Sequence, residues 1–393
     1  MTTKQKLSDV IQVNPRRQLK KGNIAPFVAM ENIVPYEKQI SEYTQRKISG
    51  SNSKFKNGDT LLAKITPSLE NGKTVFVDFL KKNEIGHGST EFFVLCGKEN
   101  QILDQFVYYL MRTSEFREEA IRSMTGTSGR QRVQETVFDD YEIILPTISI
   151  QEKISKPLSD LDAKIQNLRN QNRILEQMAQ AIFKSWFVDF DGVTEFEDSE
   201  LGKIPKGWST NILDYIANNI RNTIKSKDIT SEIFYIGLEH MPRDKVGLDT
   251  WENSHDLKSN KFKFETNHIL FGKLRPYFKK VGISPIDGIC STDILVLDSK
   301  ETQWLEFLLF TVSSYDFIEY ASQSTTGTRM PRTDWNYMKN YKIILPPETM
   351  VLKFHKIIKK SIEMMKTNIF EIKALTKTRD VLLPKLMSGE IRV

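Results

Sequence analysis

The sequence predicts an α+β protein, in which two similar α/β domains are separated by two long helices that form an antiparallel coiled coil. Two observations carry this prediction. One run starts with Thr-Gly-Thr at residues 125–127 and ends at Pro146. A similar run starts with Thr-Gly-Thr at residues 326–328 and ends at Pro346, 200 positions after Pro146. Each run is followed by apolar residues at coiled-coil spacing. Since a solenoid unit has only roughly 20 to 50 residues, the repeat indicates two modules in tandem.

Other segments repeat in the same order, at offsets that drift by a few residues. The drift indicates that loop lengths differ between the copies while the order of the elements is kept. The matched segments are 27–31 with 235–239, 62–67 with 271–276, 88–91 with 290–293, and 94–95 with 296–297, together with Phe106 and Phe116, which match Phe307 and Phe317. Both copies should therefore have the same fold.

Within each copy, short β-rich runs alternate with turns rich in Gly, Asn and Ser, and one helix is expected. The β-rich runs are 74–80, 91–95 and 141–145 in the first copy, and 233–238, 294–297 and 341–345 in the second. The helices are expected over 104–122 and 302–321. Each copy therefore reads as an α/β domain of roughly 150 residues.

The clearest periodic segment lies between the copies. From Leu158 to Trp186, apolar residues follow a three-then-four spacing, which is the seam of a coiled coil. Pro157 precedes this seam, and proline fits poorly inside a helix, so the rod is expected to begin or kink there.

A similar seam follows the second copy, so the two helices are expected to pair in an antiparallel manner, with Asn172 helping to fix the register. The alternative is that each helix packs separately on its own module. The predicted seam residues are Leu158, Leu161, Ile165, Leu168, Asn172, Leu175, Ile182, Ile358, Ile362, Met365, Ile369 and Ile372.

Composition excludes several classes of protein. The 393 residues contain no apolar run of membrane-spanning length, and the N-terminus lacks a signal-peptide core, so we expect a soluble, cytoplasmic protein. Two cysteines without metal-ligand spacing predict neither a disulfide framework nor a zinc site. The net charge of +6 resides in residues 351–393, which hold ten Lys/Arg against four Asp/Glu. A nucleic-acid surface on the modules must therefore be a local patch.

No catalytic motif is recognisable in the sequence. A Walker loop, a dinucleotide glycine fingerprint, a Gly-x-Ser-x-Gly elbow and a His-Glu-x-x-His motif are all absent, as is the Asn/Asp-Pro-Pro-Tyr motif of amino-methyltransferases. His87 and His240 lie in repeated blocks but match Ile289 and Asn32, so we interpret them as surface or loop histidines. The sequence predicts no catalytic and no metal-binding residue.

The duplicated polar loops fit DNA recognition better. Glycine allows close approach, hydroxyl groups and backbone N–H groups suit phosphate oxygens, and arginine can bind guanine in a bidentate manner. The alternative is that these are ordinary solvated loops kept similar by the duplication. The candidate DNA-binding residues are Lys64, Thr66, Lys73, Ser89, Thr90, Thr125, Gly126, Thr127, Ser128, Arg130, Gln131 and Arg132 in the first copy, and Lys273, Arg275, Lys279, Ser291, Thr292, Thr326, Gly327, Thr328, Arg329 and Arg332 in the second.

The stretch Ser-Trp-Phe-Val-Asp-Phe at 185–190 is highly specific. Through this stretch, and over its whole length, the chain resembles a known family, the specificity subunits of type I restriction-modification systems. Residues 201–208 resemble the entry to the second recognition domain, which the first copy lacks, and residues 382–391 resemble the C-terminus. The further matching runs are 150–154, 161–165 and 179–184.

The resemblance implies four segments. They are a target recognition domain at 1–148, a helical spacer at 149–190, a second target recognition domain at 191–347 and a C-terminal helical region at 348–393. Each recognition domain would read one half of a split sequence in double-stranded DNA. The helices would set the spacing and dock two methyltransferase subunits.

The resemblance also implies which chemistry belongs to other chains. This chain would bind no cofactor, because the methyltransferase subunits carry S-adenosylmethionine and the restriction subunits use ATP and Mg²⁺. Two alternatives remain open, a self-contained nuclease or methyltransferase and a coiled-coil scaffold without DNA contact.

Overall fold

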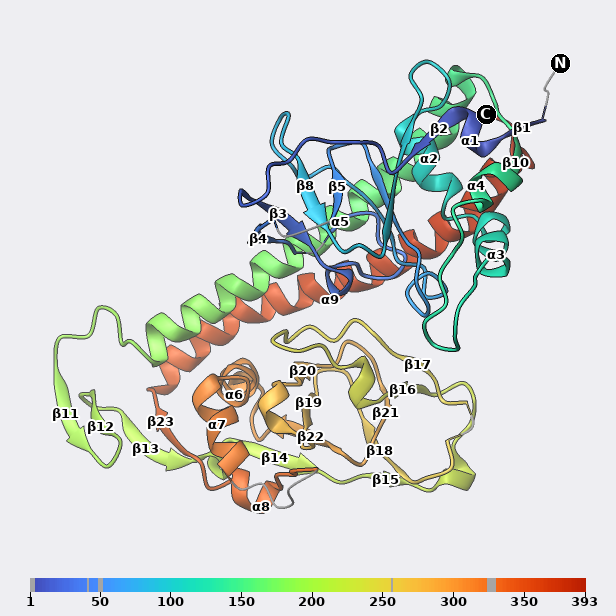
Figure 1. Cartoon of the computed structure of the whole chain (residues 1–393). Coiled ribbons are helices and arrows are strands. Elements are labelled where there is room, and N and C mark those ends of the chain that lie inside the picture. The colour runs from blue at the N-terminus through green and yellow to red at the C-terminus, as the bar shows by residue number, and fades with distance from the viewer. Residues whose placement is uncertain (1–3, 41, 49–51, 256, 324–329) are drawn as a thin grey trace. The chain divides into compact units, whose positions relative to one another are not determined.

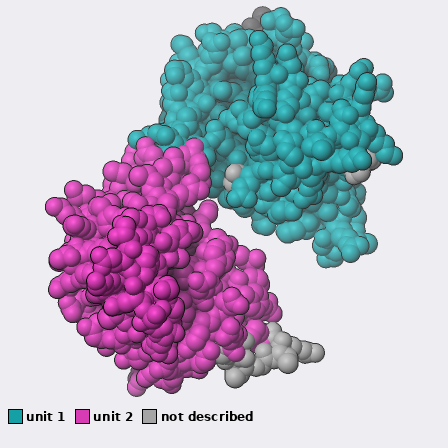
Figure 2. Space-filling view, turned by 90° about the vertical axis from the view of Figure 1, so that its left-hand side faces the viewer, with its two compact units in different colours: residues 1–167, 372–393 teal, residues 168–371 magenta. Residues whose placement is uncertain are grey.

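The computed structural model describes residues 4–40, 42–48, 52–255, 257–323 and 330–393. The chain divides into two compact units, which Figure 2 shows in teal and magenta. Unit 1 comprises residues 1–167 and 372–393, and unit 2 comprises residues 168–371. Each unit therefore contains one globular copy and a part of each long helix. Among the described residues, no helix is long and apolar enough to cross a membrane.

The globule of unit 1 contains two four-stranded sheets, with strand orders β2-β9-β6-β7 and β4-β3-β8-β5, and a two-stranded sheet β1-β10 that closes it. Most pairs are antiparallel, and β3 pairs with β8 in parallel. The strands are β1 Lys4–Lys6, β2 Ile11–Val13, β3 Ile24–Val28, β4 Thr44–Lys47, β5 Ser53–Phe55, β6 Thr60–Ala63, β7 Thr74–Phe76, β8 Gly86–Gly88, β9 Phe92–Gly97 and β10 Glu142–Ile144.

Unit 2 repeats this design with small additions. Its sheets have the orders β14-β22-β19-β20, β15-β18-β21-β16-β17 and β13-β23, and a hairpin β11-β12 precedes them. The strands are β11 Phe196–Ser199, β12 Gly202–Pro205, β13 Ser209–Ile212, β14 Ala217–Ile220, β15 Thr223–Ile224, β16 Phe234–Ile236, β17 Glu252–Asn253, β18 Lys261–Phe264, β19 Ile269–Gly272, β20 Val281–Ile283, β21 Gly288–Cys290, β22 Ile294–Ser299 and β23 Lys342–Leu345.

Local packing explains some of the repeated residues. Gly86 lies against the ring of Phe55, and a Cβ there would collide with it. Gly288 lies against Phe264 in the same way, with 2.9 Å between an added Cβ and the ring. A glycine is needed at both positions because an aromatic ring on the neighbouring strand covers the backbone.

The single helix expected in each copy is wrong, because the structure has two helices at that place. In the first copy, the hydroxyl of Thr113 accepts a hydrogen bond from the backbone N–H of Phe116 (3.3 Å) and starts a new helix. In the second copy, Ser314 does the same for Phe317 (3.2 Å). Hydroxyl side chains are preferred at helix N-termini for this reason. The helices are α2 Asp104–Leu110, α3 Ser114–Arg122, α6 Leu305–Val312 and α7 Tyr315–Gln323.

The remaining short helices also repeat. The helices α4 Val137–Asp140 and α8 Trp335–Met338 precede the last strand of each globule, and 3₁₀ helices η1 Met30–Asn32 and η4 Leu238–His240 follow β3 and β16. Helix α1 Leu7–Val10 of the first copy has the 3₁₀ helix η2 Leu213–Tyr215 at its place in the second. The other 3₁₀ helices, all in the second copy, are η3 Ser226–Asp228, η5 Pro276–Phe278 and η6 Thr302–Trp304.

Two long helices, α5 (Ile148–Phe187) and α9 (Glu348–Met387), pack together (Figure 1). In unit 1, Arg379 Nη1 donates to Asp162 Oδ1 (2.8 Å), and in unit 2, Asn368 Nδ2 donates to Asn172 Oδ1 (2.8 Å). The partner's number falls along α9 as the number rises along α5, so the predicted antiparallel pairing is confirmed. The helix begins at Ile148 and contains Pro157, so a start at this proline is wrong, and the alternative expectation of a kink there stays a prediction.

Apolar packing against the globules holds the long helices in place. In unit 1, Leu158 of α5 and Leu383 of α9 belong to the same core as Phe106 and Phe138. In unit 2, Phe183 of α5 and Phe354 of α9 are in contact with each other, with ring centroids 6.0 Å apart. Of the predicted seam residues, Leu158, Ile358, Ile362 and Met365 belong to the domain cores, and Leu175 and Ile182 pack against the core of unit 2. The four domain ranges given by the resemblance stay predictions.

Candidate functional site

Three of the duplicated segments meet in each copy. In the first copy, Lys64 N donates to Glu91 O (3.0 Å), Val133 N to Lys64 O (2.8 Å), and Thr66 N to Gln131 O (3.0 Å). The end of β6 is therefore tied to the Ser-Thr-Glu turn before β9 and to the segment after the Thr-Gly-Thr run. Segments that are 27 to 69 residues apart in the sequence thus form one surface.

The second copy has the same backbone connections. Lys273 N donates to Asp293 O (2.9 Å), and Thr333 N donates to Lys273 O (3.1 Å). Arg275 N donates to Pro331 O (2.8 Å), which matches the bond of Thr66. The sequence repeat thus marks one structural site in each unit.

An ion pair closes each of these sites. Arg132 donates to Glu91 from Nε (2.9 Å) and Nη2 (2.7 Å), and Arg332 donates to Asp293 from Nε (3.0 Å) and Nη2 (3.4 Å). The arginine side chains are 47% and 46% exposed. The hydrogen bonds from Arg132 lower the pKa of the Glu91 carboxyl group. Each guanidinium is held on one edge by a carboxylate and stays about half exposed, and Arg132 Nη1 also donates to the backbone oxygen of Arg130 (3.4 Å).

The Thr-Gly-Thr loop of the first copy is a hairpin whose side chains face solvent. Thr125 and Arg132 exchange backbone hydrogen bonds (3.0 and 2.9 Å), and Arg130 N donates to Thr127 O (3.0 Å). Gly126 has φ +121°, which suits glycine and strains other residues. Thr125, Gly126, Thr127, Ser128 and Arg130 are all exposed. Thr326, Gly327, Thr328 and Arg329 of the second copy lie outside the described residues.

Two lysines that were predicted to contact DNA, Lys73 and Lys279, form interactions within the protein. Lys73 Nζ donates to the backbone oxygen of Met30 (2.8 Å), and Lys280 Nζ donates to the equivalent oxygen of Leu238 (2.5 Å). Lys280, and not the predicted Lys279, is therefore the structural counterpart of Lys73. Lys279 lies 3.3 Å from Asp244 and 3.7 Å from the ring centre of Tyr315.

The turn residues also divide by role. The hydroxyls of Ser89 and Ser291 accept hydrogen bonds from the N–H groups of Glu91 and Asp293 (both 3.2 Å), so they shape the two turns. Thr90 and Thr292, between them, are exposed. Thr66 donates to Glu70 (2.7 Å). The sequence analysis missed Glu91 and Asp293 as site residues, although both lie in repeated segments.

The chain is similar in sequence to known proteins. Residues 3–177 match the family model of the type I restriction modification DNA specificity domain. The chain is 29% identical over 304 residues to the type I restriction enzyme MjaIX specificity subunit of Methanocaldococcus jannaschii, covering 74% of this chain and 70% of that protein. It is 26% identical to the HindI specificity subunit of Haemophilus influenzae, covering 86% and 87%.

Over most of its length, the chain is thus similar to type I restriction enzyme specificity subunits. The solved S subunit from M. genitalium has the same fold, with a TM-score of 0.59 and 17% identity over 98% of this chain and 95% of that one. The similarity to specificity subunits rests on the sequence matches, and the structural likeness supports the fold alone.

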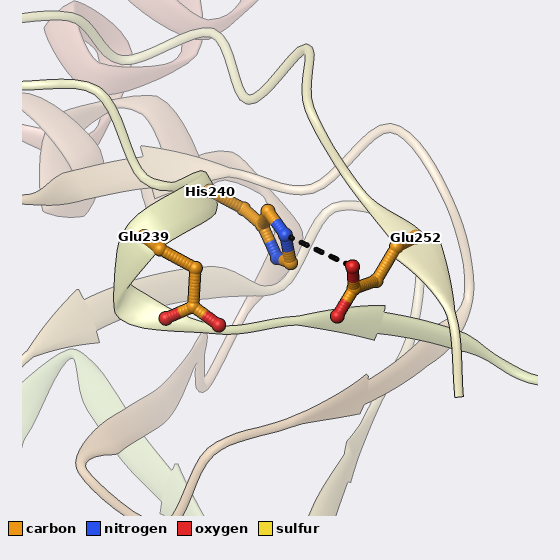
Figure 3. Close-up of side chains that lie close together, drawn as sticks. All are labelled: Glu239, His240 and Glu252. Atoms are coloured by element: carbon orange, nitrogen blue, oxygen red, sulfur yellow. Dashed lines mark ion pairs between the residues drawn. The ribbon is translucent and has the colours of Figure 1, made fainter. Parts of the chain in front are cut away.

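The chain also has one cluster of metal-ligand type among its described residues (Figure 3). Glu239, His240 and Glu252 offer ligand atoms within 4.8 Å of one another. However, His240 Nδ1 accepts a hydrogen bond from the N–H of Gly237 (2.9 Å). The neutral ring therefore carries its proton on Nε2, the atom that points toward Glu252 at 3.8 Å. A protonated ring nitrogen is no metal ligand.

The first copy indicates what His240 does. Its counterpart Asn32 accepts a hydrogen bond from the N–H of Ala29 (2.8 Å) through Oδ1. Both side chains thus bond back to the residue that precedes a 3₁₀ helix, η1 or η4. In both copies the side chain accepts a hydrogen bond from this backbone N–H group, which asparagine and neutral histidine can both do.

The interpretation of His87 as a surface or loop residue is wrong. It lies in strand β8 and is 1% exposed. Its Nε2 lies 3.2 Å from Arg46 O, and its Nδ1 lies 2.9 Å from Asn52 Nδ2. Since the carbonyl oxygen can only accept and the amide nitrogen can only donate, the ring is neutral with its proton on Nε2. Burial accordingly lowers the pKa of His87.

Proposed function

We propose that this chain is a specificity subunit that recognises a split sequence in double-stranded DNA, with one half read by each globule. The observation that carries the proposal is the duplicated site, in which an exposed arginine, a basic strand end and a hydroxyl-bearing turn come together in both copies. Arginine can read guanine, while lysine and hydroxyl groups bind phosphate. Two such sites in one chain suit a target with two separate halves.

The long helices would set the spacing of the halves and dock the other subunits. Each has 40 residues, or about 60 Å at 1.5 Å per residue, and the half-sites of a duplex are about one turn apart at roughly 34–36 Å. The partners would be two methyltransferase subunits and, in the larger assembly, restriction subunits. In this proposal the chain is not catalytic and binds no cofactor. S-adenosylmethionine, ATP and Mg²⁺ would belong to the partners.

The test is a map of modified bases in DNA from cells that express this chain with the methyltransferase subunit encoded beside it. Deletion of this chain alone is the control. A split motif of methylated adenines that disappears on deletion is the expected result. An unchanged map, with the methyltransferase shown to be active, would contradict the proposal and favour a scaffold. Methylation by this chain without partners would instead identify it as an enzyme.

A further inference from the structure

A groove in the first copy is lined by cationic and amide side chains, of which only Lys64 was predicted from the sequence to contact DNA. Its volume is about 680 Å³. It lies between the segment after β2, the edge strand β5 and the end of β6, and Lys64 and Thr90 connect it to the duplicated site. Its cationic lining residues are Arg16, Arg17, Lys54 and Lys64.

Two of the four cations in this groove have no partner among the residues that the structure describes. Arg17 is paired with the buried Asp59, and Lys64 Nζ lies 5.3 Å from the ring centre of Phe93. Arg16 and Lys54 have no carboxylate partner within the part of the chain that the structure describes. No aspartate or glutamate lines the groove. It is therefore a concave surface with unneutralised positive charge.

In the second copy, the corresponding sheet edge is covered by a further strand. Lys54 pairs with His87 across β5 and β8, and Lys263 pairs with Ile289 across β18 and β21, so Lys263 is the counterpart of Lys54. In the second copy, strand β15 covers this edge, with Thr223 opposite Phe262. In the first copy, β5 is the last strand of its sheet.

The charge differs as well. Lys263 lines one hollow whose lining includes Glu232, Glu265 and Asp287, and a second, smaller hollow together with Lys225, Lys227 and Asp228, so carboxylates line both hollows. Three carboxylates beside a lysine oppose the binding of a phosphate. The two copies thus share the reading site but differ in the groove next to it.

We infer that the groove of the first copy binds the sugar-phosphate backbone of DNA through Arg16 and Lys54, and that the second copy lacks this site. The inference rests on the proposed function and adds an asymmetry to it. The first globule supplies backbone contacts, and therefore salt-dependent affinity, that the second does not. A protein strand added at the open edge of β5 is the rival occupant. The unneutralised cations favour DNA, because backbone hydrogen bonding alone would not require them.

The experiment measures the dissociation constant of the complex of full-length chain and methyltransferase subunits for a duplex that contains its methylated motif, from 50 to 200 mM salt. Each neutralised phosphate contributes about 0.9 to the slope of log K against log salt. Arg16→Ala and Lys54→Ala should each make this negative slope shallower by about this amount. Between 50 and 200 mM salt, the affinity of each variant should therefore decrease by a factor about threefold smaller than the factor for the wild type. Lys263→Ala, the matched control, should leave the slope unchanged.

Three results would overturn the inference. If the slopes are unchanged in Arg16→Ala and Lys54→Ala and specific binding is retained, the groove does not bind the DNA backbone, while the proposed function stands. An equal effect of Lys263→Ala would remove the asymmetry. Weaker assembly with the methyltransferase at unchanged slope would assign the edge of β5 to a protein strand. If the wild-type complex does not discriminate its motif from a scrambled duplex, the proposed function itself fails. Thermal unfolding of each variant checks that the fold is intact.

Discussion

Arg132 and Glu91 form a two-pronged ion pair across 41 positions of sequence, and Arg332 and Asp293 repeat it across 39 positions in the other copy. The carboxylate fixes the orientation of an arginine whose remaining surface is open to a ligand. Side chains held in one rotamer by such supporting bonds bind with a smaller entropy loss.

Replacing the carboxylate should reduce discrimination more than stability. Half-exposed ion pairs contribute about 0–1 kcal/mol to folding, whereas a well-placed bidentate contact to a base contributes about 1–3 kcal/mol of discrimination. We expect Glu91→Gln to weaken the preference for the correct base in one half of the target, and Asp293→Asn in the other half. Competition binding with duplexes altered in one half measures this. Equal losses in both halves for either variant would contradict separate reading.

Arg130 should contribute to DNA binding without contributing to folding. Its side chain is exposed on the Thr-Gly-Thr hairpin. Arg130→Ala is expected to cost about 1–3 kcal/mol of binding if the side chain reads a base, with an unchanged melting temperature. Arg122→Ala is the matched control, because Arg122 is an exposed arginine of the same copy that pairs with Glu119 on helix α3. Equal binding by Arg130→Ala and wild type would remove this residue from the site.

The pair formed by Asp162 and Arg379 should be important for stability. Both side chains are buried, at 4% and 3% exposure, and Tyr109 also donates to Asp162 Oδ2 (2.7 Å). Removing one partner of a buried pair leaves an uncompensated charge, at a cost of about 3–5 kcal/mol. We expect Arg379→Met to lower the free energy of unfolding by this amount in urea denaturation. Asp162→Asn combined with Arg379→Met should be less harmful than Arg379→Met alone, and a greater loss in the double variant would refute the explanation.

His87 should make stability depend on pH. Burial lowers its pKa below the ordinary value of 6.5, so the folded state prefers the neutral ring. The stabilisation is complete above pH 6.5 and is lost as the pH falls from there through the lowered pKa. Between pH 7.5 and 5, wild type should therefore lose more free energy of unfolding than His87→Gln, which does not titrate. Parallel pH profiles of the two proteins would show that His87 does not contribute.

His240 should behave as a structural residue rather than as a metal ligand. His240→Asn places the side chain of its first-copy counterpart Asn32 at this position and should preserve stability. His240→Ala removes the backbone bond and should cost about 0.5–2 kcal/mol, by analogy with helix N-caps. Neither Zn²⁺ nor a chelator should shift the melting temperature of wild type. A shift that His240→Asn abolishes would instead establish a metal site.

The repeat allowed the main features of the fold to be predicted from the sequence. Apolar spacing around residues such as Leu158 and Ile362 predicted two helices that pair, and the match of Pro146 with Pro346 predicted two copies. Periodicity could not locate the start of α5, because Pro157 is tolerated inside the helix and its first turns pack on the globule. The breaks at Thr113 and Ser314 were missed because apolar residues continue on both sides of each N-cap.

The candidate site was predicted in part. Matching the copies identified the three segments that meet at Lys64 and Lys273, but not which charged groups neutralise each other. The pairing of Arg132 with Glu91 requires the fold, since a guanidinium and a carboxylate 41 positions apart carry no sequence signal. The groove at Arg16 was missed for a different reason: it is a feature that only one copy has, and a search for matches cannot detect it.

The first and last strands of each globule pair with each other, β1 with β10 and β13 with β23. The chain therefore enters and leaves each globule at one place, next to the start of a long helix. A folding unit whose ends meet can be replaced by another of the same outline without redirecting the chain around it. Genetic recombination between related genes could thus exchange one half of the protein as a cassette. A host would acquire a new half-target in a single event while the other half, and the helices, are inherited unchanged.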